Sequence, residues 1–204
     1  MKVALLAGGF GTRLSEETSI RPKPLVEIGG RPIMWHIMKI YAHYGLRDFV
    51  IIGGYKVQMI REFFLRYQMD TTDFTIDLRT GSVKWLGEVA EDWRVTVIDT
   101  GVDTMTGGRL RRARHLLSDG PFCLTYGDGV SDVDIGKLIE THRQLGRWCT
   151  VTGTGQCFAA VRITSGVSSV LSSMKMISDS SGGGTAASVA GSRLLREHFP
   201  AGET

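Results

Sequence analysis

The chain has 204 residues, of which 42% are hydrophobic and 22% charged, as is typical of a globular protein. The length predicts a single domain. The formal net charge of +3, from 24 basic and 21 acidic residues, is too balanced to predict a nucleic-acid partner. Three cysteines without a C-x-x-C pair indicate reduced thiols and a cytoplasmic protein. The apolar N-terminal run, residues 3–7, is too short to predict a signal peptide or a membrane span.

Five apolar runs predict buried strands, and four segments with apolar residues at helical spacing predict helices between them. The runs cover residues 3–7, 48–52, 95–99, 122–126 and 149–152. The helices are expected at 32–44, 57–67, 109–117 and about 132–145, with Ser131 or Asp132 capping the last one. Because strands and helices alternate, the sequence predicts an α/β fold with a Rossmann-like, mostly parallel sheet flanked by helices.

Three segments depart from this alternation. Residues 25–28 predict a short strand that follows the first loop. An insertion covers about residues 68–93, in which 74–78 and 83–86 are expected to pair as a hairpin, and it is a candidate for assembly. After residue 152 the chain is rich in Ser and Gly and has little periodicity. We therefore divide it into a core, residues 1–152, and an irregular tail, residues 153–204.

The first strand leads into a loop with three glycines in four residues, and the cations Arg13 and Lys23 follow it. Glycines let backbone N–H groups approach a ligand closely, and successive N–H groups form an anion-binding concavity. Arg13 offers a planar fork for phosphate oxygens, and Lys23 offers a point charge. The loop therefore predicts a polyphosphate ligand. It fits neither the G-x-x-x-x-G-K-[ST] pattern nor G-x-G-x-x-G, which disfavours a dinucleotide oxidoreductase.

Two further loops are expected at the same sheet edge, because ligands of open α/β sheets bind outside the carboxyl ends of the strands. Asp128 lies between two glycines, so its carboxylate is unhindered and suits Mg²⁺ together with substrate phosphates. Arg109 follows two glycines and could reach a nucleotide, whereas Arg111, Arg112 and Arg114 are expected to be charges on a helix surface. The alternatives are an ordinary turn aspartate at 128 and a surface arginine at 109.

Four motifs together carry a resemblance to a known family. They are L-A-G-G-F-G-T-R-L from residue 6, R-P-K-P from 21, D-T-G-x-x-T-M-T-G-G-R-L-R-R from 99, and F-x-L-T-Y-G-D-G-V-S-D-V from 122. The first two resemble the signature of sugar-phosphate nucleotidyltransferases. All four together, over about residues 1–152, look like those of the glucose-1-phosphate cytidylyltransferases.

The resemblance implies the nucleotidyltransferase fold, with CTP and glucose 1-phosphate as substrates and CDP-glucose and pyrophosphate as products. It also implies Mg²⁺, a homo-oligomer, and nucleotide-sugar synthesis for lipopolysaccharide O-antigen. Arg13, Lys23 and Asp128 would carry the catalysis, with Asp128 as the metal ligand. The substrate-binding positions that the motifs imply are Leu6, Ala7, Gly8, Gly9, Phe10, Gly11, Thr12, Arg13, Lys23, Thr104, Arg109 and Asp128.

The resemblance stops near residue 152. The family's R-F-G-A-L, E-K-P and N-G-G-F motifs, which supply sugar contacts, are absent, as is a later aspartate that completes the metal site. The sequence therefore predicts a nucleotide half without a recognisable sugar half, which puts the activity of this chain in doubt. One hypothesis is a shifted reading frame, because codons for residues 183–188 can encode W-N-G-G-F in another frame.

Two alternatives stay open at this point. A thymidylyl- or uridylyltransferase acting on a sugar 1-phosphate would use the same glycine loop and cations. A nucleotide-binding module without catalysis would need that loop but no sugar pocket. By the resemblance, the Trp35-His36 pair and the T-M-T-G-G-R-L block from residue 104 favour cytidylyl transfer over the first alternative. Binding of CTP without release of pyrophosphate would favour the second.

Overall fold

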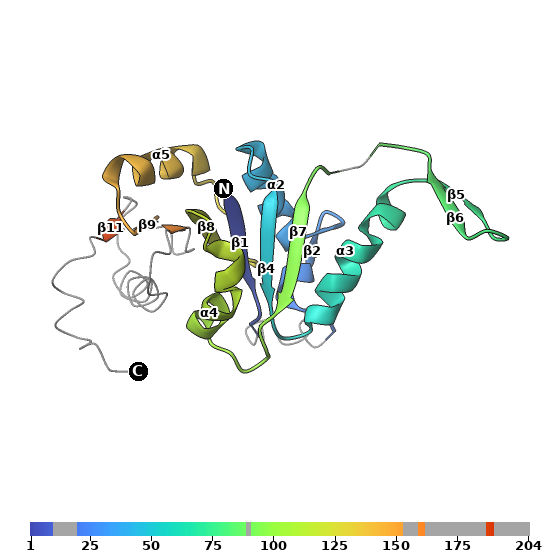
Figure 1. Ribbon diagram of the computed structural model, residues 1–204, viewed down its shortest axis with the longest axis horizontal. Helices are drawn as coiled ribbons and strands as arrows, with labels where there is room; N and C mark the ends of the chain where they lie inside the picture. The colour runs from blue at the N-terminus through green and yellow to red at the C-terminus, as the bar shows by residue number, and fades with distance from the viewer. Residues whose placement is uncertain (10–19, 89–90, 153–158, 162–186, 190–204) are drawn as a thin grey trace.

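The protein is described by a computed structural model that covers residues 1–9, 20–88, 91–152, 159–161 and 187–189 (Figure 1). Within these residues the main sheet has seven strands in the order β11-β9-β10-β8-β1-β4-β7. Four adjacent strands, at the β7 end of the sheet, run parallel, which confirms the predicted sheet. They are β1 (Lys2–Ala7), β4 (Asp48–Gly53), β7 (Arg94–Asp99) and β8 (Phe122–Tyr126).

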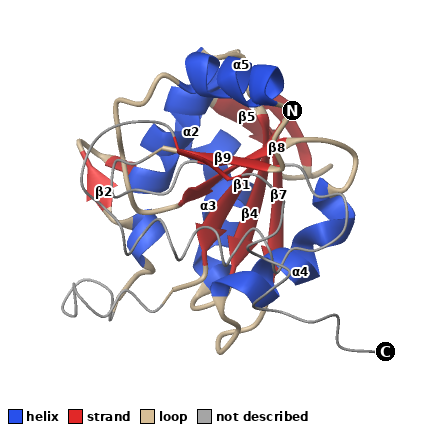
Figure 2. Cartoon of the chain, turned by 90° about the vertical axis from the view of Figure 1, so that its left-hand side faces the viewer, coloured by secondary structure: helices blue, strands red, loops and turns tan. Residues whose placement is uncertain are grey.

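Helices cover both faces of this sheet, so successive residues of β1 point into two different cores (Figure 2). Val3 and Leu5 face one core, and Ala4 and Leu6 face the other. A strand that is buried on both faces reads as a continuous apolar run, as the sequence of β1 does. The first core packs against α2 (Ile33–His43), α3 (Val57–Thr71) and α5 (Ile135–Leu145), and the second against α4 (Thr106–Leu117).

Several predicted boundaries shift. The helix predicted to begin at Arg109 begins at Thr106, so the Thr106–Arg109 segment is the first turn of α4 and not a loop. The cap of α5 is Asp134, whose side chain accepts from the Lys137 amide at 2.9 Å, and not Ser131 or Asp132. Where a strand was predicted at 25–28, the chain forms a short 3-10 helix, Lys23–Leu25, and then β2 (Glu27–Ile28), paired with β3 (Arg31–Pro32).

The direction of the chain across the sheet reverses at β1. From β1 the chain moves to β4 and β7 on one side, and α4 then carries it back to β8 on the other side of β1. In doubly wound sheets such a reversal leaves a crevice at the carboxyl ends of the strands, where ligands bind. The fold therefore selects the ends of β1 and β8 as the place to look for a site.

The predicted hairpin is present. Strands β5 (Phe74–Asp77) and β6 (Ser82–Trp85) pair antiparallel as a separate two-stranded sheet. Figure 1 shows them projecting away from the main sheet, beyond the end of α3. They lie within the predicted insertion at about residues 68–93.

Two short strands come from the segment predicted as an irregular tail. Strand β10 (Ala159–Val161) lies antiparallel between β8 and β9 (Cys149–Val151), and β11 (Ala187–Val189) pairs with the other edge of β9. Residues 153–158, 162–186 and 190–204 are outside the described part of the chain, and the domain division at 152 stays a prediction. Among the residues that the structure describes, no helix is both long and apolar enough to cross a membrane.

Candidate active site at the sheet switch point

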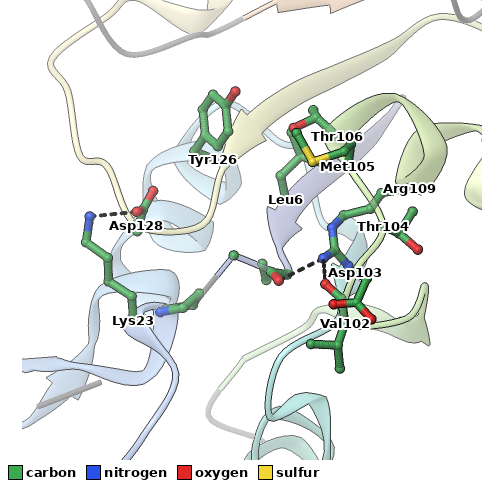
Figure 3. A pocket seen from close by; sticks show the side chains of 14 residues that line it. Leu6, Lys23, Val102, Asp103, Thr104, Met105, Thr106, Arg109, Tyr126 and Asp128 are labelled. Atoms are coloured by element: carbon green, nitrogen blue, oxygen red, sulfur yellow. Dashed lines mark hydrogen bonds and ion pairs between the residues drawn. The ribbon is translucent and has the colours of Figure 1, made fainter. Parts of the chain in front are cut away.

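A pocket of about 440 Å³ opens at the switch point, between the carboxyl ends of β1 and β8 and the start of α4 (Figure 3). Its walls come from four separate segments of the chain, which the parallel sheet brings to one edge. Its lining residues are Leu6, Ala7, Gly8, Gly9, Lys23, Pro24, Val102, Asp103, Thr104, Met105, Thr106, Arg109, Tyr126 and Asp128.

The backbone after β8 lies directly against the backbone after β1. The Gly127 amide donates to the Leu6 carbonyl at 2.9 Å. A Cβ atom at Gly127 would lie 3.3 Å from the Leu6 carbonyl oxygen and 3.5 Å from the Cβ of Ala7. Glycine at this position therefore lets the two strand ends approach closely and brings Asp128 to the mouth of the pocket.

Lys23 and Asp128 form an ion pair at one edge of the pocket, with Lys23 Nζ 2.7 Å from Asp128 Oδ2 (Figure 3). The 3-10 helix Lys23–Leu25 holds Lys23, because Pro24 and Leu25 are buried beneath it. The two side chains are 27% and 33% exposed, so both remain open to a ligand. A cation and an anion thus lie side by side at this edge of the pocket.

Arg109 is 6% exposed, and its guanidinium group is surrounded by backbone carbonyls instead of facing solvent. Nη1 donates to Gly53 O at 3.0 Å, Thr100 Oγ1 at 2.7 Å and Gly101 O at 2.8 Å, and Nη2 to Gly8 O at 2.9 Å and Val102 O at 3.0 Å. These acceptors follow three neighbouring strands, β1, β4 and β7. Burial lowers the pKa of Arg109 below its usual range, against a raising effect of Asp99.

Two glycines make room for this guanidinium group. A Cβ atom at Gly8 would lie 2.3 Å from Arg109 Cζ, and one at Gly54 would lie 2.1 Å from Arg109 Nη1. Both distances are far inside van der Waals contact, so any side chain at either position displaces Arg109. The glycine after β1 therefore serves the packing of Arg109 as well as the approach of a ligand.

Arg112 was predicted to be a charge on the helix surface, but its guanidinium group also forms hydrogen bonds to the loop before the helix. Its Nη1 donates to the Thr100 carbonyl and to Thr104 Oγ1, the latter at 2.8 Å. Thr104 is one of the predicted nucleotide contacts and lines the pocket. Arg112 thus holds the loop between β7 and α4 from the exposed side of the helix, while Arg111 and Arg114 are exposed as predicted.

The pocket contains every predicted substrate position that the structure describes: Leu6, Ala7, Gly8, Gly9, Lys23, Thr104, Arg109 and Asp128. Phe10, Gly11, Thr12 and Arg13 lie outside the described residues. Lining positions that the sequence did not single out are Pro24, Val102, Asp103, Met105, Thr106 and Tyr126. Each of these lies within two residues of a predicted position along the chain, and that proximity is the signal that could have found them.

The described residues contain no cluster of three or more His, Cys, Asp or Glu side chains that could hold a metal ion. Asp128 is a single carboxylate at the pocket edge. That donor fits Mg²⁺, which keeps several waters and binds through one or two carboxylates plus substrate phosphates. It does not fit a metal held by the protein alone.

A doubly wound sheet with a cation-lined pocket at its switch point defines a nucleotide-binding α/β protein. Residues 2–156 match the nucleotidyl transferase family, and the chain belongs to that family. It is 48% identical over 155 residues to the glucose-1-phosphate cytidylyltransferase of Salmonella typhimurium strain LT2, which covers 76% of this chain and 60% of that protein. The chain thus spans about three fifths of this relative's length.

More distant relatives share the same part of the chain. The mannose-1-phosphate guanyltransferase of Emericella nidulans is 30% identical over 159 residues, covering 76% of this chain and 37% of that protein. The crystal structure of UDP-glucose pyrophosphorylase complexed with UDP-glucose superposes with a TM-score of 0.54 at 15% identity. It covers 74% of this chain and 55% of that one, and at this identity the likeness shows the fold alone.

Proposed function

We propose that the protein is a cytidylyltransferase, or part of one, that transfers a cytidylyl group from CTP to glucose 1-phosphate and releases CDP-glucose and pyrophosphate. The observation that carries the proposal is the pocket between β1 and β8, edged by the Lys23–Asp128 pair. The 48% identity to a protein named for cytidylyl transfer supports CTP over the guanylyl donor of the 30% identical relative.

In this reaction an oxygen of the sugar phosphate forms a bond to the α-phosphorus of CTP. The bond from the α-phosphorus to its bridging oxygen breaks, and pyrophosphate leaves with that electron pair. Such a transfer requires alignment and charge neutralisation more than acid–base chemistry. The Gly8–Gly9 backbone and Arg13 would hold the triphosphate, and Lys23 would turn from Asp128 to the reacting phosphates.

We propose Asp128 as the ligand of Mg²⁺. When bound, the ion would neutralise charge on the α-phosphate and hold it for in-line attack. Lys23 is the only cation paired with this carboxylate among the described residues, so substrate phosphates entering the pocket would compete for Lys23 and release Asp128 for the metal. The same exchange would leave both groups correctly placed once the substrate is bound.

The pyrophosphate released from CTP and glucose 1-phosphate in the presence of Mg²⁺ tests this proposal. We expect faster release with CTP than with UTP or dTTP, and equal or reversed rates would favour a thymidylyl- or uridylyltransferase. Calorimetric titration with CTP and Mg²⁺ completes the design. Binding without release would favour a non-catalytic nucleotide-binding module, which the end of the family match at residue 156 makes the second candidate.

The proposal extends to where the protein acts, how it assembles and which synthesis it serves. The protein would act in the cytoplasm, consistent with the reduced thiols of Cys123 and Cys149, both buried in the described structure. It would assemble as a homo-oligomer and contribute nucleotide sugars to O-antigen synthesis, as the family resemblance implies. Sequencing the gene tests the shifted reading frame: a neighbouring frame that does not continue the family motifs would rule it out.

A further inference from the structure

Among the described residues that line the pocket, four carry a charge, and three of these already have partners within the protein. Lys23 and Asp128 form an ion pair. Arg109 donates to one hydroxyl and four backbone carbonyls. The fourth is Asp103, an exposed carboxylate whose side chain has neither an ion pair nor a hydrogen bond within the described part of the chain. This carboxylate is therefore free to bind a ligand.

Asp103 lies at a different edge of the pocket from the groups proposed to hold phosphate. Figure 3 shows it beside Val102, apart from the Lys23–Asp128 pair. A carboxylate repels phosphate oxygens, so the triphosphate is favoured at the Lys23 edge and disfavoured near Asp103. The part of the nucleotide that Asp103 can contact is therefore its uncharged part, the nucleoside.

Uncovered apolar side chains flank this carboxylate along the chain. Val102 is 43% exposed and Met105 is 81% exposed, and both line the pocket. Ligand pockets combine apolar walls with a few polar groups that fix the orientation of the ligand. A nucleobase has the complementary surface, because its ring faces are apolar and its hydrogen-bonding groups lie on its edge. The surroundings of Asp103 therefore fit the base better than the ribose.

Two arginines of α4 hold the loop that carries this carboxylate. Arg109 donates to the carbonyls of Gly101 and Val102 at 2.8 and 3.0 Å. Arg112 donates to Thr104 Oγ1 at 2.8 Å, so the loop is tied to the helix on both sides of residue 103. An acceptor whose backbone is already fixed loses little conformational entropy when a ligand binds, and it cannot easily turn away from a mismatched ligand.

We propose that the Asp103 carboxylate accepts a hydrogen bond from the exocyclic amino group of cytosine and thereby selects CTP over UTP and dTTP. An ionised carboxylate can only accept hydrogen bonds. Cytosine carries an N4 amino donor at the position where thymine, like uracil, carries the O4 acceptor. UTP or dTTP in the same pose would place O4 against the carboxylate, so two acceptors would face one another. This inference rests on the nucleotide named in the proposed function, but it does not depend on catalysis.

The test is calorimetric titration of the whole chain with CTP and with UTP, each in the presence of Mg²⁺. The readout is the ratio of the two affinities, because loss of a negative charge strengthens the binding of both triphosphates alike. We expect the preference for CTP over UTP to fall roughly tenfold in Asp103→Ala, the effect of losing one contact to a base edge. UTP should bind more tightly to Asp103→Asn than to Asp103→Ala, because the amide can donate to O4.

Asp73→Asn is the matched control for Asp103→Asn, because it removes an exposed carboxylate outside the pocket. It should leave the ratio of affinities unchanged, and thermal unfolding followed by circular dichroism checks that every variant is folded. Equal weakening of CTP and UTP binding in Asp103→Ala would place the carboxylate on the ribose and would overturn the inference.

The outcomes also separate this inference from the proposed function. A wild type that prefers CTP, with the same preference in Asp103→Ala, overturns the role of Asp103 alone. A wild type that binds both nucleotides equally overturns the inference and the choice of CTP, but leaves nucleotide binding intact. A wild type that binds neither overturns both proposals. The expected ratios without release of pyrophosphate would support the inference and overturn only the catalysis.

Discussion

At the residue scale, the pair Lys23 and Asp128 shows how two distant motifs make one site. The neighbouring residue fixes the backbone of each. Pro24, next to Lys23, is buried, and Gly127, next to Asp128, packs closely against β1. Their 2.7 Å contact is partly exposed, so its contribution to stability is small, about 0–1 kcal/mol. Its value is positional, because it keeps a cation and an anion at the pocket edge before substrate arrives.

Lys23→Ala should therefore reduce ligand binding and transfer far more than stability. We expect pyrophosphate release to fall by about 100-fold or more, the cost typical of losing one preorganised electrostatic partner. CTP affinity measured by calorimetry should fall as well. Lys39→Ala is the control, since it removes a half-exposed lysine that pairs with Glu91 at 3.1 Å outside the pocket. Equal CTP affinity in the two variants would remove Lys23 from the site.

Arg13→Ala addresses a predicted contact that lies outside the described residues. If the guanidinium group forms a fork on the triphosphate, its loss should weaken CTP binding by about 1.5–3 kcal/mol, the range for a hydrogen bond to a charged group. The measurement is calorimetric titration with CTP and Mg²⁺. Unchanged affinity would contradict the assignment of the glycine loop to the triphosphate.

Cys123 offers a prediction on stability against pH. Burial raises the pKa of its thiol from 9.0 to about 12. In the unfolded state the thiol ionises near pH 9, whereas the native thiol stays protonated, so stability is fully present below pH 9 and is lost as pH rises toward 12. The expected loss is about 1.4 kcal/mol per pH unit in that window. Urea unfolding should show a shallower alkaline loss for Cys123→Ala than for the wild type, and identical slopes would contradict the assignment.

At the element scale, helix α4 holds together the strand ends that line the pocket. It is the crossover that carries the chain from β7 back to β8, and its first turn places Arg109 under the ends of β1, β4 and β7. A single guanidinium group with several donors can satisfy carbonyls from three strands at once, which a lysine cannot do. The loops that line the pocket are thereby held at fixed distances from one another.

Arg109→Met should lower both stability and CTP affinity. The carbonyls of Gly8, Gly53 and Gly101 would each lose a charged donor, and a hydrogen bond to a charged group contributes about 1.5–3 kcal/mol. Thermal unfolding and CTP titration measure the two effects. Arg114→Met, on the exposed side of the same helix, should stay within about 0.5 kcal/mol of the wild type. Similar melting temperatures for the two variants would show that Arg109 does not hold the strand ends.

At the scale of the whole molecule, the sheet extends beyond the segment that matches the family. Strand β10 lies between β8 and β9, so it covers the edge of β8 opposite β1. An uncovered strand edge exposes unpaired backbone groups and promotes association with other chains. The short strands after residue 152 thus have a structural consequence for the core.

Deleting residues 153–204 should therefore destabilise the core, and deleting only residues 190–204 should not. The longer deletion removes β10 and β11 and uncovers β8, whereas the shorter one leaves both strands in place. We expect a lower melting temperature and more light scattering on heating for the longer deletion. Equal melting temperatures would mean that β10 contributes little to the sheet.

Local signals in the amino-acid sequence predict the parallel core and the glycine loop that follows its first strand. Apolar runs such as that of β1 are buried on both faces, and a glycine loop after such a strand has few other uses, so both signals are local. The hairpin is also predicted by a local signal, because two short alternating segments are joined by a turn. Its apolar face followed only once the register paired Ile76 with Val83.

Tertiary structure alone decided what Arg109 and Lys23 contact. Arg109 lines the pocket, and its acceptors are the Thr100 hydroxyl and four backbone carbonyls, one of them 101 residues away in Gly8. Every residue carries such a carbonyl, so no sequence pattern marks the partner. The contact of Lys23 with Asp128 likewise depends on the parallel order of β1 and β8, which brings together two strand ends that the chain reaches far apart.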